Sequence, residues 1–151
     1  MTMLGGMNLK RIILGGLAAG LLYDIFEITL SRFIAGEQFE TELNAIRHTP
    51  PSAAGYAFFC AWGFVIGIIG VCLYAAVRPR FGPGPRTAAR VAISLWVIGD
   101  LMPHLGSAFM GIFTLNLMLK FALQQLVFML ASVIFGAWLY KEEPTVSAAA
   151  L

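Results

Sequence analysis

Charged residues are scarce in this chain. Asp, Glu, Lys and Arg make up 12% of its 151 residues, whereas hydrophobic residues make up 59%, and the mean hydropathy is +0.81. A soluble domain carries roughly 25% charged residues, so this chain has too few to cover a surface that faces water. The composition excludes an ordinary soluble enzyme and a disordered chain. We therefore expect an integral membrane protein with the lipid bilayer as its surroundings.

Basic clusters and paired-cysteine motifs are also missing. The net charge is +2, and no run of Lys and Arg is dense enough to follow a phosphate backbone, which excludes a nucleic-acid partner. The two cysteines, Cys60 and Cys72, lie in one apolar stretch, about 18 Å apart along a helix. Without a CxxC pair, neither a redox site nor a zinc site is indicated, and the sequence identifies no cofactor.

Long apolar stretches are what the chain does have. Crossing a bilayer takes about 20 residues, and four stretches are long enough: 11–34, 54–77, 87–112 and 117–140. Proline and glycine between them favour exits from helix, most strongly at Arg-Pro-Arg-Phe-Gly-Pro-Gly-Pro. The sequence predicts one all-α transmembrane domain over 1–151, an antiparallel bundle of four transmembrane helices. A short flexible tail is expected over 141–151.

The basic residues predict the orientation. With a cytoplasmic N-terminus, the inner side holds seven Lys and Arg residues: Lys10, Arg11, Arg78, Arg80, Arg86, Arg90 and Lys141. The other side holds three: Arg32, Arg47 and Lys120. Because cytoplasmic loops carry the excess of Lys and Arg, we expect both termini to be cytoplasmic. The first outer loop is then mildly acidic, with Glu37, Glu40 and Glu42.

Polar residues inside the spans fall at similar depths. A rise of about 1.5 Å per residue from Lys10 places Asp24 about 21 Å and Glu27 about 25 Å into a core roughly 30 Å thick. A charge in hydrocarbon costs at least about 2.5–3.5 kcal/mol, so these side chains should face inward. The sequence predicts an outer-leaflet polar pocket among the first, third and fourth spans, formed by Asp24, Glu27, Asp100, His104, Lys120 and Gln124.

Two details of this pocket are also predicted. Lys120 is placed to neutralise one carboxylate, and Glu27 should contact Asp100, His104, Lys120 or Gln124. Gln125 is about 100° away from Gln124 around the helix, so we expect it to face another neighbour or lipid headgroups.

Several uses of such a pocket stay open. Carboxylates with one imidazole suit a divalent cation, for which Glu27, Asp100 and His104 are the candidate ligands, and spaced acids suit proton transfer. The pocket also suits a small ligand. A membrane enzyme that uses Glu27 or Asp100 with His104 as acid and base is less favoured, because no HExxH or paired Glu-x-x-His motif is present. The alternative is a non-catalytic accessory subunit of a membrane complex, in which the polar layer only fixes the helices.

Glycines recur at helical spacing on two spans. Gly16 and Gly20 share a face of the first span, and Gly63, Gly67 and Gly70 share a face of the second. Small residues at this spacing let helix backbones approach closely in lipid. We therefore predict that these five glycines pack against neighbouring helices, within the chain, in a homo-oligomer or against a membrane partner.

Four segments of the sequence carry a family resemblance: 14–20, 61–64, 73–85 and 136–141. On these segments the chain resembles an uncharacterised family of small bacterial four-helix integral membrane proteins, and the proline- and glycine-rich loop within 78–85 is the most specific part. The resemblance implies a multi-pass protein of the bacterial inner (cytoplasmic) membrane. It also implies that Glu27 is the family's acidic residue.

Overall fold

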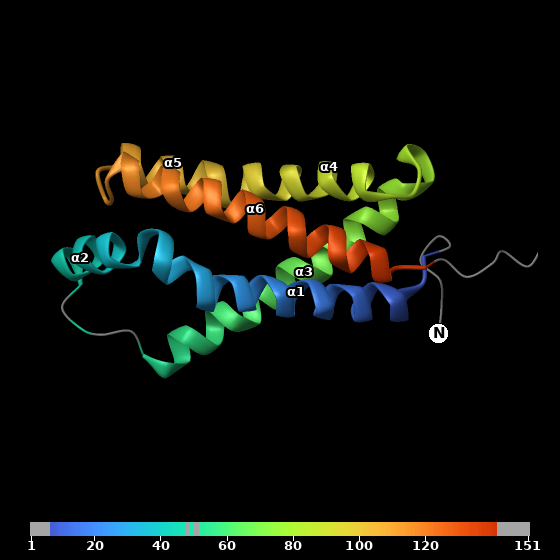
Figure 1. Cartoon of the computed structure of the whole chain (residues 1–151), viewed down its shortest axis with the longest axis horizontal. Coiled ribbons are helices and arrows are strands. Elements are labelled where there is room, and N and C mark those ends of the chain that lie inside the picture. The colour runs from blue at the N-terminus through green and yellow to red at the C-terminus, as the bar shows by residue number, and fades with distance from the viewer. Residues whose placement is uncertain (1–6, 48, 50–51, 142–151) are drawn as a thin grey trace, which may run out of the picture.

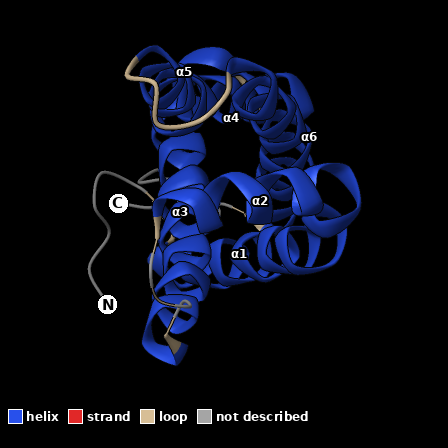
Figure 2. Cartoon of the chain, turned by 90° about the vertical axis from the view of Figure 1, so that its left-hand side faces the viewer, coloured by secondary structure: helices blue, strands red, loops and turns tan. Residues whose placement is uncertain are grey.

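The chain folds into helices joined by short connections. A computed structural model describes residues 7–47, 49 and 52–141, and no strand occurs among them (Figure 2). Figure 1 shows the elements, which are α1 (Leu9–Ser31), the π-helical turn η1 (Arg32–Gly36), α2 (Glu37–Ile46), α3 (Ala53–Phe81), α4 (Pro85–Trp96), the π-helical turn η2 (Val97–Leu101), α5 (Met102–Phe109) and α6 (Leu115–Leu139).

Four helical segments are long and apolar enough to cross a membrane. Within the described part of the chain they are Leu9–Ile46, Ala53–Phe81, Pro85–Phe109 and Leu115–Leu139. This confirms the predicted all-helical chain with four apolar spans, and it is compatible with a multi-pass membrane protein. Residues 142–151 of the expected tail lie outside the described residues.

The first span is longer than predicted. It was expected to end at residue 34, but η1 continues the helix and α2 extends it to Ile46. Gly36, with φ −58° and ψ −47°, stays in the helical region, and Glu and Gln, which favour helix, follow it. The three glutamates predicted to lie in an outer loop are therefore helical, which matters for the placement of Lys120 below.

The second span also passes its predicted end. It was expected to stop near residue 77, yet α3 includes Pro79 and ends at Phe81. The Gly82 N–H donates to Arg78 O at 2.8 Å, which closes the last turn. Gly82 and Gly84 have φ of +81° and +121°, a region that glycine enters without steric cost, so the chain turns there and not at the proline.

The helices pack around two separate apolar clusters. α1 lies against α3 and α6, while α4 lies against α6 and α3, and α5 lies against α6. The larger cluster includes Ala19, Val71 and Val133. The smaller one, at the end of the bundle where α2 and α5 lie, is built on Ala35, Leu117 and Met118 (Figure 1).

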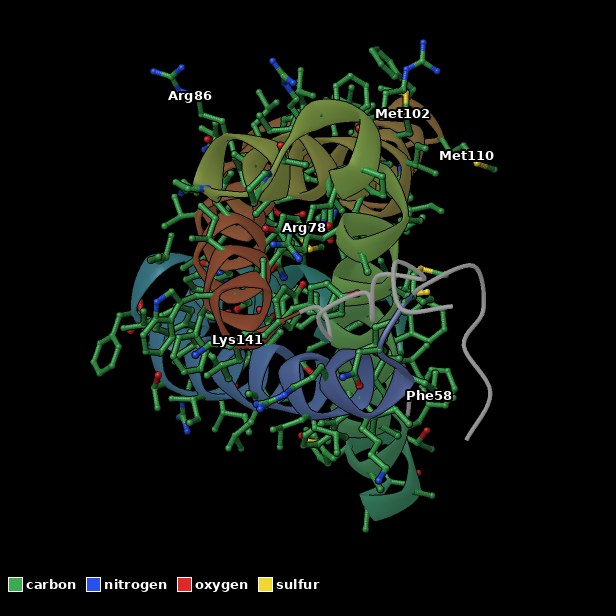
Figure 3. All side chains as sticks on the ribbon, turned by 90° about the vertical axis from the view of Figure 1, so that its right-hand side faces the viewer. Phe58, Arg78, Arg86, Met102, Met110 and Lys141 are labelled. Carbon is green, nitrogen blue, oxygen red and sulfur yellow. The ribbon has the colours of Figure 1, made fainter. Side chains whose placement is uncertain are left out.

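Aromatic side chains close the opposite end of the bundle. The Asn8 N–H donates to Tyr140 Oη at 3.3 Å, which joins the start of α1 to the end of α6. The Arg78 guanidinium carbon lies 5.7 Å from the centroid of the Tyr140 ring. In Figure 3, Arg78 points in among the helices at this end, whereas Arg86 points away from them.

Candidate functional site

A layer of polar side chains separates the two apolar clusters. We call it the polar layer, and its members are Tyr23, Asp24, Glu27, Ser31, Asp100, His104, Gln124 and Gln125. On α6, for example, the glutamines lie between Met118 of the smaller cluster and Phe128 of the larger one. The same order holds along α1 and along the α4–η2–α5 segment. Apolar side chains therefore bound the layer at both ends.

Gln125 links α6 to α1. The Tyr23 hydroxyl donates to Gln125 Oε1 at 2.8 Å, and Gln125 Nε2 donates to Glu27 Oε2 at 2.9 Å. Tyr23 and Glu27 lie four residues apart, so both side chains project from one face of α1. One buried amide thus satisfies a hydroxyl and a carboxylate of the same helix. This placement corrects the prediction that Gln125 faces elsewhere or reaches lipid headgroups.

Gln124 makes a second link between the same helices. Its Nε2 donates to Ser31 Oγ, one turn beyond Glu27. Its Oε1 is buried and has no hydrogen-bond partner among the described residues, and the side chain is only 5% exposed. The two neighbouring glutamines therefore both bind α1, but only Gln125 makes hydrogen bonds through both its side-chain oxygen and its side-chain nitrogen.

Asp24 lies against α3. A Cβ atom on Gly63 would stand 2.7 Å from Asp24 Cγ and 3.1 Å from its Oδ2, so the carboxylate occupies the space that a side chain there would fill. Asp24 is 8% exposed, and its Oδ2 has no hydrogen-bond partner among the described residues. On this side, α3 therefore borders the polar layer with the backbone of Gly63 and not with a side chain.

Asp100 enters the layer from the π-helical turn η2. The Met102 N–H donates to Val97 O, five residues earlier, and this wide turn ends just before Pro103, which has no N–H to donate. Such turns are frequent at functional sites. Asp100 is 8% exposed, and its Oδ2 has no hydrogen-bond partner among the described residues.

His104 is fixed by the same turn. Its Nδ1 lies 2.6 Å from Asp100 O, and because a carbonyl only accepts, Nδ1 must carry the proton there. This leaves Nε2 as the nitrogen that can accept a proton or bind a ligand. The ring lies 6.1 Å from that of Phe121, centroid to centroid, at the boundary with the smaller apolar cluster.

Lys120 does not join the carboxylates of the layer. Its Nζ donates to Gln38 Oε1 on α2 at 2.8 Å. Gln38 Nε2 in turn donates to Glu42 Oε1 at 2.8 Å, and Glu42 Oε2 accepts from the Thr114 N–H at 2.8 Å. We call these four residues the latch. This corrects the prediction that Lys120 neutralises an acid of the layer, because α2, where a loop was expected, supplies its hydrogen-bond partner.

Glu27 is the acid that interacts with both other acids of the layer. It interacts electrostatically with Asp24 and with Asp100 and His104. The Tyr23 hydroxyl lies near enough to interact with all three carboxylates. Of the four partners predicted for Glu27, the structure puts Asp100 and His104 within electrostatic range. The Glu27 carboxylate accepts hydrogen bonds from Gln125 and Ser31.

The polar layer has more acceptors than donors. Its side-chain donors include Tyr23 Oη, Gln124 Nε2, Gln125 Nε2 and His104 Nδ1, each of which already makes a hydrogen bond to a protein oxygen. The buried atoms without a partner, among the described residues, are all oxygens here: Asp24 Oδ2, Asp100 Oδ2 and Gln124 Oε1. A buried acceptor without a donor costs about 1–3 kcal/mol. The layer is therefore complementary to a group that brings protons or positive charge.

The predicted metal ligands do not converge. Among the described residues, no three His, Cys, Asp or Glu side chains are grouped closely enough to hold a metal ion. Glu27, Asp100 and His104 are neighbours in the layer, but Glu27 turns toward α6 and the His104 Nδ1 toward the backbone. Divalent metal binding by this trio would need the side chains to rearrange.

The predicted packing glycines lie where helices cross. A Cβ on Gly16 would stand 2.5 Å from Ile68 Cα, and one on Gly20 would stand 2.5 Å from Phe64 Cα. A Cβ on Gly67 would stand 2.9 Å from Gly20 Cα. These three glycines thus bring the backbones of α1 and α3 together. A Cβ on Gly70 would instead stand 2.9 Å from the Val133 side chain, and one on Gly63 would overlap the Asp24 carboxylate.

Comparison with known proteins gives no relative. No family model, no curated protein and no solved structure matches the chain. The functional interpretation therefore depends on the site itself.

Three members of the polar layer were not among the predicted site residues: Tyr23, Ser31 and Gln125. Spacing offered a signal for two of them, because Tyr23, Glu27 and Ser31 follow each other at steps of four residues. For Gln125 the signal was the Gln-Gln pair itself. Two adjacent amides in an apolar helix both need partners, and here α1 supplies the partners of both.

Proposed function

We propose that this chain is a small multi-pass protein of the bacterial inner membrane whose polar layer binds protons or a cation. The observation that carries the proposal is the pair of buried carboxylate oxygens, Asp24 Oδ2 and Asp100 Oδ2, that lack a protein donor. A carboxylate in hydrocarbon is costly, and a proton or a cation removes both its charge and its missing hydrogen bond. Glu27 interacts electrostatically with both acids, so we expect proton binding at one acid to affect the others.

The topology of the proposal is an antiparallel bundle with both termini in the cytoplasm. The contact between Asn8 and Tyr140 supports the same side for both ends of the chain, and the excess of Lys and Arg at that end supports the cytoplasmic side. The polar layer and the latch then lie in the outer half of the membrane. The smaller apolar cluster separates the layer from the outer water.

A titration of the purified protein in detergent micelles tests the binding proposal. Sodium, potassium and magnesium chlorides are added in turn to a weakly buffered sample, and both heat and released protons are measured. We expect cation binding to release protons from the wild type and from Glu37→Gln, whose exposed carboxylate lies outside the layer. We expect Asp24→Asn/Asp100→Asn to lose the release. Equal release from all three proteins would contradict the proposal.

A second function, an accessory subunit of a membrane complex, is favoured by one observation. The first ten residues of α3, 53–62, include no buried residue, and Figure 1 shows that this end of α3 diverges from the other helices. Its exposed side chains include Phe58, Phe59 and Trp62. Co-purification from native membranes with a stable partner chain, lost when these aromatic residues are changed to Leu, is the result expected for this function.

A further inference from the structure

We infer that Gly63 on α3 is a positioning residue for Asp24, because the missing side chain of Gly63 forms the recess that holds the Asp24 carboxylate. The inference deepens the proposed function, since it concerns one of the two acids on which that function depends. It assigns a role in the site to a helix that contributes no polar side chain to the polar layer.

The atoms nearest to Gly63 carry the inference. A Cβ built on Gly63 would overlap Asp24 Oδ1 and would stand 2.7 Å from Cγ and 3.1 Å from Oδ2. All three of these closest atoms belong to the Asp24 carboxylate group, and none is a backbone atom of α1. A methyl group at position 63 would therefore displace the carboxylate before it pushed the helices apart.

Neighbouring glycines on the same face behave differently. A Cβ on Gly67, one turn further along α3, would meet backbone atoms of Gly16 and Gly20, with Gly20 Cα at 2.9 Å. A Cβ on Gly20 would meet Phe64 Cα at 2.5 Å. These glycines hold two backbones together, which is the packing role expected of small residues in lipid. Gly63 makes room for an acid instead.

The recess explains how Asp24 can be buried without a protein donor. The side chain is 8% exposed, and α3 backbone covers it where a larger residue would stand. Gly63 therefore keeps the Asp24 carboxylate within the bundle and within electrostatic range of Glu27. A side chain at position 63 would push the carboxylate from this place and separate the two acids.

A double-mutant cycle separates positioning from packing. Gly63→Ala and Gly67→Ala are each introduced into the wild type and into Asp24→Ala, and the Tm of the full chain is measured in detergent micelles. We expect Gly63→Ala to lower Tm by roughly 3–6 °C in the wild type and to have little effect once the Asp24 carboxylate is removed. Gly67→Ala, the matched control, should lower Tm equally in both backgrounds.

A second readout follows the carboxylate itself. Proton release on addition of cations should be reduced in Gly63→Ala but retained in Gly67→Ala when the latter is assayed below its lowered Tm. If Gly63→Ala does not fold, a folded Asp24→Ala/Gly63→Ala protein supports positioning. The inference is overturned if Gly63→Ala lowers Tm by the same amount in the wild type and in Asp24→Ala. The cycle needs no ligand, so a wild type that releases no protons on cation addition contradicts cation binding by the layer and leaves the cycle valid.

Discussion

The side-chain amide of Gln125 on α6 donates a hydrogen bond of 2.9 Å to the Glu27 carboxylate on α1. The same amide accepts from the Tyr23 hydroxyl, so one residue of α6 satisfies two polar groups of α1. This bridge crosses the polar layer between the two apolar clusters. The other two acids of the layer, Asp24 and Asp100, each have a buried carboxylate oxygen without a protein donor. The same layer therefore holds α1 to α6 and contains carboxylate oxygens that can accept a proton.

Replacing Gln125 should destabilise the bundle. Gln125→Met keeps the length of the side chain but removes the partners of Tyr23 and Glu27, and an unsatisfied buried polar group costs about 1–3 kcal/mol. We expect a lower Tm in detergent micelles. Gln124→Met, the control, removes only the bond to Ser31 and should cost less. A Gln125→Met protein as stable as the wild type would show that the bridge does not hold α1 to α6.

The close approach of α1 and α3 should tolerate no large side chain. Gly20→Leu places its Cβ 2.5 Å from Phe64 Cα, and overpacking a tight contact costs about 1–3 kcal/mol. Gly106→Leu, on α5, is the matched control because no atom lies within 4 Å of a Cβ there. We expect Gly20→Leu to lower Tm in detergent micelles and Gly106→Leu to leave it unchanged. Equal stability of both variants would mean that α1 and α3 do not cross at Gly20.

The latch should protect the start of α6 from solvent. Thr114 is the N-cap of α6, so its N–H has no partner within the helix, and Glu42 accepts it. Glu42→Ala should speed hydrogen exchange at the Thr114 amide. Glu40→Ala, an exposed acid on the same helix, should leave it unchanged. Mass spectrometry of peptides that contain Thr114 measures the difference, and unchanged exchange in Glu42→Ala would contradict the latch.

Cysteine labelling tests the orientation. In a background with Cys60→Ala and Cys72→Ala, Glu40→Cys should react with an impermeant maleimide added outside intact cells. Arg86→Cys, which replaces an arginine that points away from the helices (Figure 3), should react only after the membrane is made permeable. The reverse pattern would place the termini outside and the polar layer in the inner half of the membrane.

The helical spans were predictable because hydropathy and length decide them. The ends of the helices could not be predicted in the same way. Pro79 was expected to end the second span, but the helix continues past it, and the chain turns only at Gly82. The two π-helical turns leave no pattern in the sequence. One of them, η1, carries the first helix onward to Ile46 and brings Gln38 within reach of Lys120, so the predicted partner of that lysine was wrong.

The acids of the site were predictable and their amide partner was not. Asp24, Glu27 and Asp100 stood out because charge inside an apolar span is costly. Gln125 was left out of the predicted pocket because it lies about 100° from Gln124 around an ideal helix. A helix at the edge of a bundle buries only one face, so both glutamines were not expected to be buried. α6 has α1 on one side and α4 and α5 on others, so both glutamines are buried.

Infrared difference spectroscopy of the carboxyl groups tests the proton- or cation-binding layer most directly. The protein, in lipid nanodiscs without added metal salts other than those of the buffer, is titrated with acid and base while the absorption of protonated carboxyl groups is followed. We predict a band from protonated carboxyls that persists at neutral pH, decreases on cation binding, weakens in Asp24→Asn and in Asp100→Asn, and is unchanged in Glu37→Gln. A wild-type spectrum with no such band at neutral pH, and with no change on addition of sodium, potassium or magnesium, would contradict it.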